Sequence, residues 1–306
     1  MANKKILVVI DPTEKGEQPV IERAAWLAEK TSAAVELFAS DFDAQIDAGH
    51  VSTVWIQQAE PPRDHLVNIH RENLAKLAEP LKKRGLKVTT DVAWDHPLGE
   101  AIVRKVVKSK PWLVAKDTHH HNLLKRTVLT NTDWHLIRGC PAPLLLVKPR
   151  KIAAKPKFFA AIDPLHEHDK PAQLDDKIFD FAKGLVKAVG GELNVVHAFT
   201  APVGLDLPMD IVDAIGGQHR EAMAAFVKKH HIAEQNVHLL QGSPAECLVD
   251  VANDEQADFM VMGAVSRRGL DRLFIGSTAN RVLDRLPCCV VIVKPEGFES
   301  ALPHSD

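Results

Sequence analysis

The chain of 306 residues has few of the features that would place it outside ordinary globular proteins. Its four cysteines follow no recurring spacing, which argues against a disulfide framework. No apolar run approaches the ~20 residues of a membrane span, and the run Ile6–Ile10 is too short for a signal-peptide core. The net charge of −2 gives no reason to expect a nucleic-acid or bilayer partner. We therefore expect a cytoplasmic globular protein with no membrane span and no nucleic-acid partner.

What the chain does contain is a long internal repeat. The segment Cys140–Pro149 returns as Leu286–Pro295, and Thr132 returns as Thr278, both with a shift of 146 residues. Further upstream, the tripeptide Ile-Asp-Pro occurs twice with a shift of 152 residues. Matches in the same order, with a shift that changes only by loop-sized amounts, indicate two homologous domains. We place them at residues 1–150 and 151–306.

Each half alternates apolar runs with amphipathic helical patterns, which predicts parallel βαβ units. The runs are almost continuously apolar, as a sheet covered on both faces requires. The fold class is α/β, with two doubly wound domains that each contain a five-stranded parallel sheet. The predicted strands are Lys5–Ile10, Ala34–Ala39, Lys87–Ala93, Trp112–Ala115 and Leu144–Val147, then Phe158–Ile162, Glu192–His197, Asn236–Gln241, Phe259–Met262 and Val290–Val293.

The second half carries a pattern that favours anion binding. Gly263 follows the strand Phe259–Met262, and Gly276-Ser277-Thr278 opens a predicted helix, Ala279–Leu286. A glycine at a strand end lets a phosphate approach the backbone, and a helix N-terminus presents unpaired N–H groups to it. The loop between them also holds three arginines. Gly-Ser-Thr alone would be read as a simple helix start; strand, glycine, basic loop and capped helix in this order favour a phosphate site.

These residues resemble the universal stress protein family, whose pattern is Gly, two residues, Gly, nine residues, Gly, then Ser or Thr. Both halves match, so the resemblance is to the tandem, E-type subtype. It implies two Rossmann-like (adenine nucleotide alpha hydrolase-like) domains and a stress-response protein that binds ATP or AMP, with Mg²⁺ only if ATP binds. Asp163 would face the nucleoside and Val196 would border the adenine. The loop would contribute Met262, Gly263, Ser266, Gly276, Ser277 and Thr278.

Ser266 stands where the family pattern has its second glycine. A left-handed backbone costs a non-glycine residue roughly 1–2 kcal/mol. That cost corresponds to roughly five- to thirty-fold weaker binding. We therefore expect the pocket to be present but to have an altered affinity, with ATP binding weakened more than the binding of a simple anion.

The first half lacks the glycines altogether. Lys116 replaces the first of them, His119 falls where the second would be, and Thr130 takes the third. We expect domain one to be degenerate in nucleotide binding and mainly structural or a partner surface. Lys116 would then act as a built-in cation in the vacated space.

Catalysis is not indicated, since nothing resembles a P-loop lysine motif or a Ser–His–Asp order. We expect a binding protein of a small phosphate-containing ligand, with ATP hydrolysis that is weak at most. The runs His119–His121 and 166–168 invite a metal hypothesis, but no ligand cluster has metal spacing, so no metal site is predicted.

Two other functions stay open. The apolar residues of segment 201–215 could line a cleft for a lipid or other apolar ligand, although an amphipathic helix is the simpler interpretation. The chain could also be an interaction scaffold without nucleotide, whose partners are other stress proteins or a second copy of itself.

Overall fold

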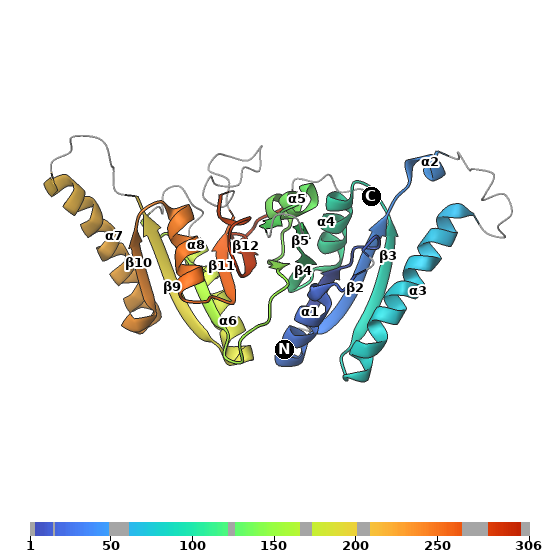
Figure 1. Cartoon of the computed structure of the whole chain (residues 1–306), viewed down its shortest axis with the longest axis horizontal. Helices are drawn as coiled ribbons and strands as arrows, with labels where there is room; N and C mark the ends of the chain where they lie inside the picture. The colour runs from blue at the N-terminus through green and yellow to red at the C-terminus, as the bar shows by residue number, and fades with distance from the viewer. Residues whose placement is uncertain are drawn as a thin grey trace. The chain divides into compact units, whose positions relative to one another are not determined.

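The computed structural model describes residues 4–14, 16–48, 61–121, 126–165, 173–200, 209–264 and 281–300, and for 119–121, 126–128 and 209–212 it describes only the backbone (Figure 1). The chain forms two compact units. Unit 1 comprises Met1–Thr118, Thr130–Val147 and Glu299–Asp306, and unit 2 comprises His119–Leu129 and Lys148–Phe298. These units lie close to the predicted division at residue 150 and differ from it in three short segments, 119–129, 148–150 and 299–306.

Unit 1 is built of alternating strands and helices. In chain order they are β1 (Lys5–Val9), α1 (Pro19–Thr31), β2 (Ala34–Asp41), α2 (Ala44–Asp47), α3 (Pro62–Lys83), β3 (Val88–Trp94), α4 (Leu98–Ser109), β4 (Leu113–Asp117), α5 (Asn131–Gly139) and β7 (Leu144–Val147). The strand order is β3-β2-β1-β4-β7, and every neighbouring pair is parallel.

Unit 2 repeats this arrangement. Its elements are β8 (Lys157–Ala161), α6 (Leu174–Val189), β9 (Glu192–Phe199), α7 (Met209–His230), the 3-10 turn η2 (Glu234–Asn236), β10 (Val237–Gln241), α8 (Pro244–Asp254), β11 (Phe259–Gly263) and β12 (Cys289–Val293). The parallel order is β10-β9-β8-β11-β12. The predicted α/β class and all ten predicted strands are confirmed, with ends that shift by at most two residues.

The strand order reverses beside the first strand of each unit. β2 and β3 lie on one side of β1, and β4 and β7 lie on the other; β8 has the same place in unit 2. Ligands of doubly wound sheets bind outside the carboxyl ends of the strands at this switch point. The fold therefore directs attention to the residues that follow β1, β4, β8 and β11.

Burial explains why the apolar runs became strands. Five strands, β1, β4, β7, β11 and β12, are buried along almost their whole length. In unit 2 the rings of Phe158 and Phe259, from neighbouring strands, stack with centroids 4.5 Å apart. Helix α6 ends at Gly190, whose φ of +79° is the left-handed C-cap that its sequence predicts.

The strand pair that follows β4 was not predicted. Residues in the polar stretch after β4 form an antiparallel hairpin of β5 (His119–His121) and β6 (Arg126–Val128). Of the helix predicted after the glycine-rich loop, the described part shows helical backbone at residues 281–282, followed by a turn. None of the described helices has the length and apolar character to cross a bilayer.

Candidate functional site

The carboxyl edge of the unit 2 sheet brings together residues that lie far apart in the sequence. Ala161 of β8 pairs with Val196 of β9 on one side and with Met262 of β11 on the other. Asp163 follows β8 at this edge, next to the end of β11 at Gly263. The side chain of Val196 is completely buried and that of Met262 is 5% exposed. Both therefore belong to the floor beneath the edge rather than to its open surface.

Asp163 is the accessible acid at this edge. Its carboxylate is 32% exposed, and its Oδ1 lies 3.7 Å from Nδ1 of His197. Its backbone N–H donates to Oδ1 of Asp175, 3.1 Å away, in the first turn of α6. The N-terminus of α6 thus holds the turn that carries Asp163. The carboxylate of Asp175 is itself favourably placed, because the N-terminus of a helix stabilises a negative charge in its first turn.

A buried histidine pair lies directly behind Asp163. His197 Nδ1 is 3.1 Å from the carbonyl of Ile162, and its Nε2 is 2.9 Å from Nδ1 of His219 on α7. A carbonyl only accepts, so the network assigns the proton of His197 to Nδ1 and leaves Nε2 to accept from His219. The His219 ring also stacks on Phe199, with centroids 4.2 Å apart. Sequence reasoning missed this pair, although a histidine that ends a buried apolar strand is a signal of it.

Gly263 has a clear structural reason to be glycine. A Cβ at this position would lie 2.8 Å from Cδ2 of Leu174 and 3.1 Å from Cδ1 of Ile178, both on α6. The glycine therefore allows close packing of helix on strand, one of the roles of glycine in dinucleotide-binding folds. The buried ammonium of Lys294 donates to the carbonyl of Ala264 (3.3 Å) and holds the chain where the loop begins.

The rest of the predicted loop cannot be placed. Four of the predicted nucleotide-binding residues, Ser266, Gly276, Ser277 and Thr278, lie outside the described residues. So do residues 166–168 and 201–208, on which the second metal hypothesis and much of the apolar-ligand hypothesis rest. In the parts of the chain that are described, no three His, Cys, Asp or Glu side chains gather as a metal site would need.

The same edge in unit 1 corrects one sequence prediction. Val9 pairs with Lys116 in β4 as Ala161 pairs with Met262 in β11. Lys116 therefore corresponds to Met262, and Asp117 takes the place of Gly263. The predicted equivalence of Lys116 with the glycine was wrong by one residue. The prediction had aligned the last residues of the two predicted strands. The hydrogen-bonded pairing of β4 and β11 instead keeps the shift of 146 residues that is found elsewhere in the repeat.

Lys116 is nevertheless a built-in cation. Its buried ammonium lies 2.8 Å from Oδ1 of Asp133, which is completely buried in the first turn of α5. The other oxygen of Asp133 accepts from the backbone N–H of Thr130 (2.7 Å), and the two residues form a capping box. In the second copy Ala279 stands where Asp133 stands in the first. Unit 1 thus fills the N-terminus of this helix with its own carboxylate.

Asp117 adds a second negative group at this edge. Burial raises the pKa of Asp117 to about 6, while the backbone N–H of Val20 and the charges of Lys116 and Arg23 oppose the rise. Within the described residues, neither of its carboxylate oxygens has a side-chain or backbone partner of good hydrogen-bond geometry. A charged carboxyl in this environment repels an anionic ligand.

The two units therefore belong to the class of Rossmann-like α/β domains, present in two copies whose strand-end residues differ. The chain matches the Universal stress protein family at residues 2–148 and 169–294, and it belongs to that family. Universal stress protein E of Salmonella typhi is 28% identical over 99% of this chain and 98% of its own length. The predicted tandem, E-type subtype is confirmed.

Solved structures agree with this assignment. A protein of unknown function from Pseudomonas aeruginosa PAO1 has a TM-score of 0.76 and 26% identity, over 96% of this chain and 93% of that one. A universal stress protein from Archaeoglobus fulgidus shares the fold with a TM-score of 0.66, at 17% identity, over 96% and 99% of the two chains.

Proposed function

We propose that unit 2 binds an adenine nucleotide or a related phosphate ligand at the carboxyl edge of its sheet. The chain would act in a cytoplasmic stress response, as a binding protein with weak ATP hydrolysis at most. The ligand would contact Asp163, the start of the loop at Gly263, and the loop residues Ser266 and Gly276–Thr278.

The observation that carries this proposal is the contrast between the two copies at matched positions. Unit 1 has a buried ion pair of Lys116 with Asp133, and the second carboxyl of Asp117. The second copy has Met262, Gly263 and Ala279 at those three places. The second copy therefore lacks both of these carboxylates, and the segment from Gly263 to the predicted helix start at Gly276 holds three arginines and one aspartate, a balance that suits a phosphate.

The histidine pair supports binding rather than hydrolysis. A general base needs a free nitrogen within reach of the attacking water. Within the described part of unit 2, His197 lies 3.7 Å from Asp163, and both of its nitrogens are engaged, with the Ile162 carbonyl and with His219. His197 is therefore a positioning residue that fixes the end of β9 against Ile162.

Calorimetric titration of the full chain with ATP, ADP and AMP tests the proposal. Gly276→Val places a branched side chain at the opening of the helix and should weaken binding by roughly tenfold or more, about 1.4 kcal/mol. Gly184→Val is the matched control, since it makes the same change on α6 where an added Cβ meets open space. Unchanged ATP affinity in a folded Gly276→Val protein would remove the assignment.

A further inference from the structure

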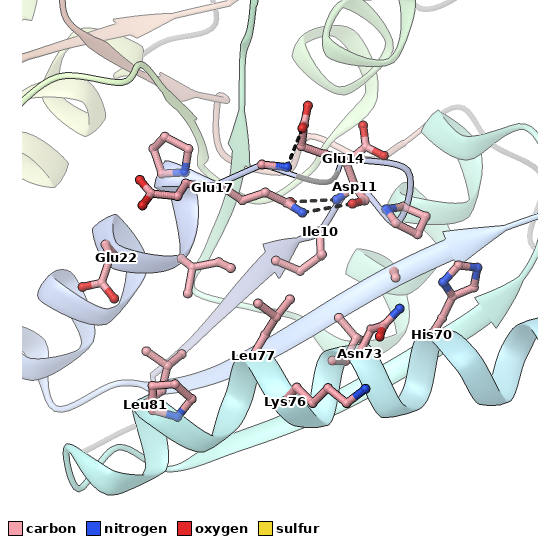
Figure 2. A pocket seen from close by; sticks show the side chains of 18 residues that line it. Ile10, Asp11, Glu14, Glu17, Glu22, His70, Asn73, Lys76, Leu77 and Leu81 are labelled. Atoms are coloured by element: carbon pink, nitrogen blue, oxygen red, sulfur yellow. Dashed lines mark hydrogen bonds between the residues drawn. The ribbon is translucent and has the colours of Figure 1, made fainter.

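Unit 1 has an open groove that the blocked phosphate edge does not use. A cavity of about 730 Å³ lies between α1 and α3, beyond the carboxyl end of β1 (Figure 2). Its volume falls within the ~300–1,000 Å³ typical of small-molecule sites. Leu74, Leu77 and Leu81 of α3 form one apolar wall, and Ile21 of α1 lies opposite. The groove can therefore accept an apolar body the size of a small metabolite.

Unit 2 has a larger side chain at one position that matches the groove. The carbonyl of Phe38 accepts from Ile10 N–H (2.8 Å), just as the carbonyl of Val196 accepts from Ile162 N–H (3.0 Å). Ala39, which lines the groove, therefore corresponds to His197, which bonds to His219. A methyl group in unit 1 stands where an imidazole stands in unit 2. At this matched position the floor of the groove therefore carries a smaller side chain in unit 1 than unit 2 carries.

The described lining of the groove carries more negative than positive charge. Among these residues, the β1–α1 loop and α1 contribute four carboxylates, and α3 contributes one ammonium, that of Lys76 (Figure 2). Glu22 is already paired with Arg84 at 2.8 Å, and one oxygen of Glu14 accepts from Gly16 N–H. Glu17 lies between them on the same side. A phosphate or carboxylate would meet like charge here, and an ammonium would meet opposite charge.

His70 lines the groove with its imidazole ring. Its Nε2 lies 2.7 Å from Oδ2 of Asp41, so the network assigns the proton to that nitrogen. Its Nδ1 is buried, and among the described residues it has no hydrogen-bond partner. His70 lies on α3 at the end of the groove near Asp11 (Figure 2).

We propose that this groove in unit 1 is a binding site for a small amphipathic amine. The apolar body of the ligand packs against Leu74 and Leu77, and its ammonium group lies toward Glu14 and Glu17. The site is separate from the proposed nucleotide site in unit 2 and takes the opposite charge.

Three probes with the same carbon skeleton test the proposal on the full chain. They are 3-phenylpropylamine, 3-phenylpropanol and 3-phenylpropionate, compared by calorimetry or ligand-observed NMR. We expect the amine to bind roughly tenfold or more tightly than the carboxylate, with the alcohol between them. Equal affinity for the amine and the carboxylate would overturn the charge argument.

Two matched variants locate the ammonium. Glu17→Gln should weaken amine binding about two- to five-fold, the range expected for one solvent-exposed charge pair. Lys76→Gln removes the opposing charge and should leave amine binding unchanged or tighter. Weaker binding in Lys76→Gln, or unchanged binding in Glu17→Gln, would contradict the assignment.

A third variant tests the location independently of charge. Leu77→Trp fills the groove and should abolish amine binding, while tryptophan fluorescence and circular dichroism check that the protein is folded. Amine binding that persists in folded Leu77→Trp would overturn the proposal. Saturating ATP should not displace the amine, so failure of the nucleotide proposal and failure of this one are distinguishable.

Discussion

Replacing Lys116 by methionine, the residue at the matched position of the second copy, should strongly destabilise unit 1. The carboxylate of Asp133 is completely buried, and its Oδ1 lies 2.8 Å from the Lys116 ammonium. No hydrogen bond from another group reaches that oxygen within the described residues. Removing one member of a buried pair leaves an uncompensated charge and costs ~3–5 kcal/mol. That is a large part of the ~5–15 kcal/mol that stabilises a typical domain.

The double variant Lys116→Met with Asp133→Ala should be much more stable than Lys116→Met alone. It installs both residues of the second copy and leaves no buried charge behind. Replacing a buried pair by apolar residues is often neutral. The remaining loss is the capping interaction of Asp133 with Thr130, which we expect to cost ~1 kcal/mol.

Tryptophan fluorescence during urea unfolding measures these effects in unit 1 alone. All five tryptophans lie between residues 26 and 134, in the segments that form unit 1. Lys82→Met is the control, because its exposed pair with Glu79 should contribute less than ~1 kcal/mol. A double variant whose loss equals the sum of the two single losses would refute the reasoning.

Three further predictions concern single side chains. Because burial raises the pKa of Asp117 to about 6, the native state holds its proton more tightly than the unfolded chain, so stability falls as pH rises from about 4 to about 6. Asp117→Asn should therefore raise stability at pH 7 by up to ~3 kcal/mol, measured by urea unfolding; no gain would contradict this environment. Ser266→Gly should strengthen nucleotide binding roughly five- to thirty-fold in calorimetry, and weaker binding would show that the serine makes a useful contact. His219→Phe keeps a ring beside Phe199 but leaves His197 Nε2 without its donor, so circular dichroism in urea should show a loss of ~1–3 kcal/mol; an unchanged midpoint would argue against the pair.

The sequence was sufficient for the strands and their order of appearance, because buried parallel strands are continuous apolar runs. It was not sufficient for the register of β4, where aligning predicted strand ends displaced Lys116 by one position and the hydrogen-bonded ladder placed it correctly. The hairpin β5–β6 was also missed, because its polar stretch has no apolar alternation.

The candidate site contains side-chain contacts between residues that are far apart in the sequence, and no local sequence pattern predicts such contacts. His197 and His219 come from a strand and a helix 22 residues apart, and Lys116 meets Asp133 across the loop between them. Each side chain has an ordinary interpretation when it is read alone. The groove beside Ala39 is visible only as space between two helices, which a sequence does not record.

The most direct test of the central claim is the number of nucleotides bound per chain. Native mass spectrometry of the full chain at saturating ATP or AMP should show one bound nucleotide. Gly276→Val should lose it, and Gly184→Val should keep it. Two bound nucleotides, or one that survives Gly276→Val in a folded protein, would contradict the account of an open second copy and a blocked first copy.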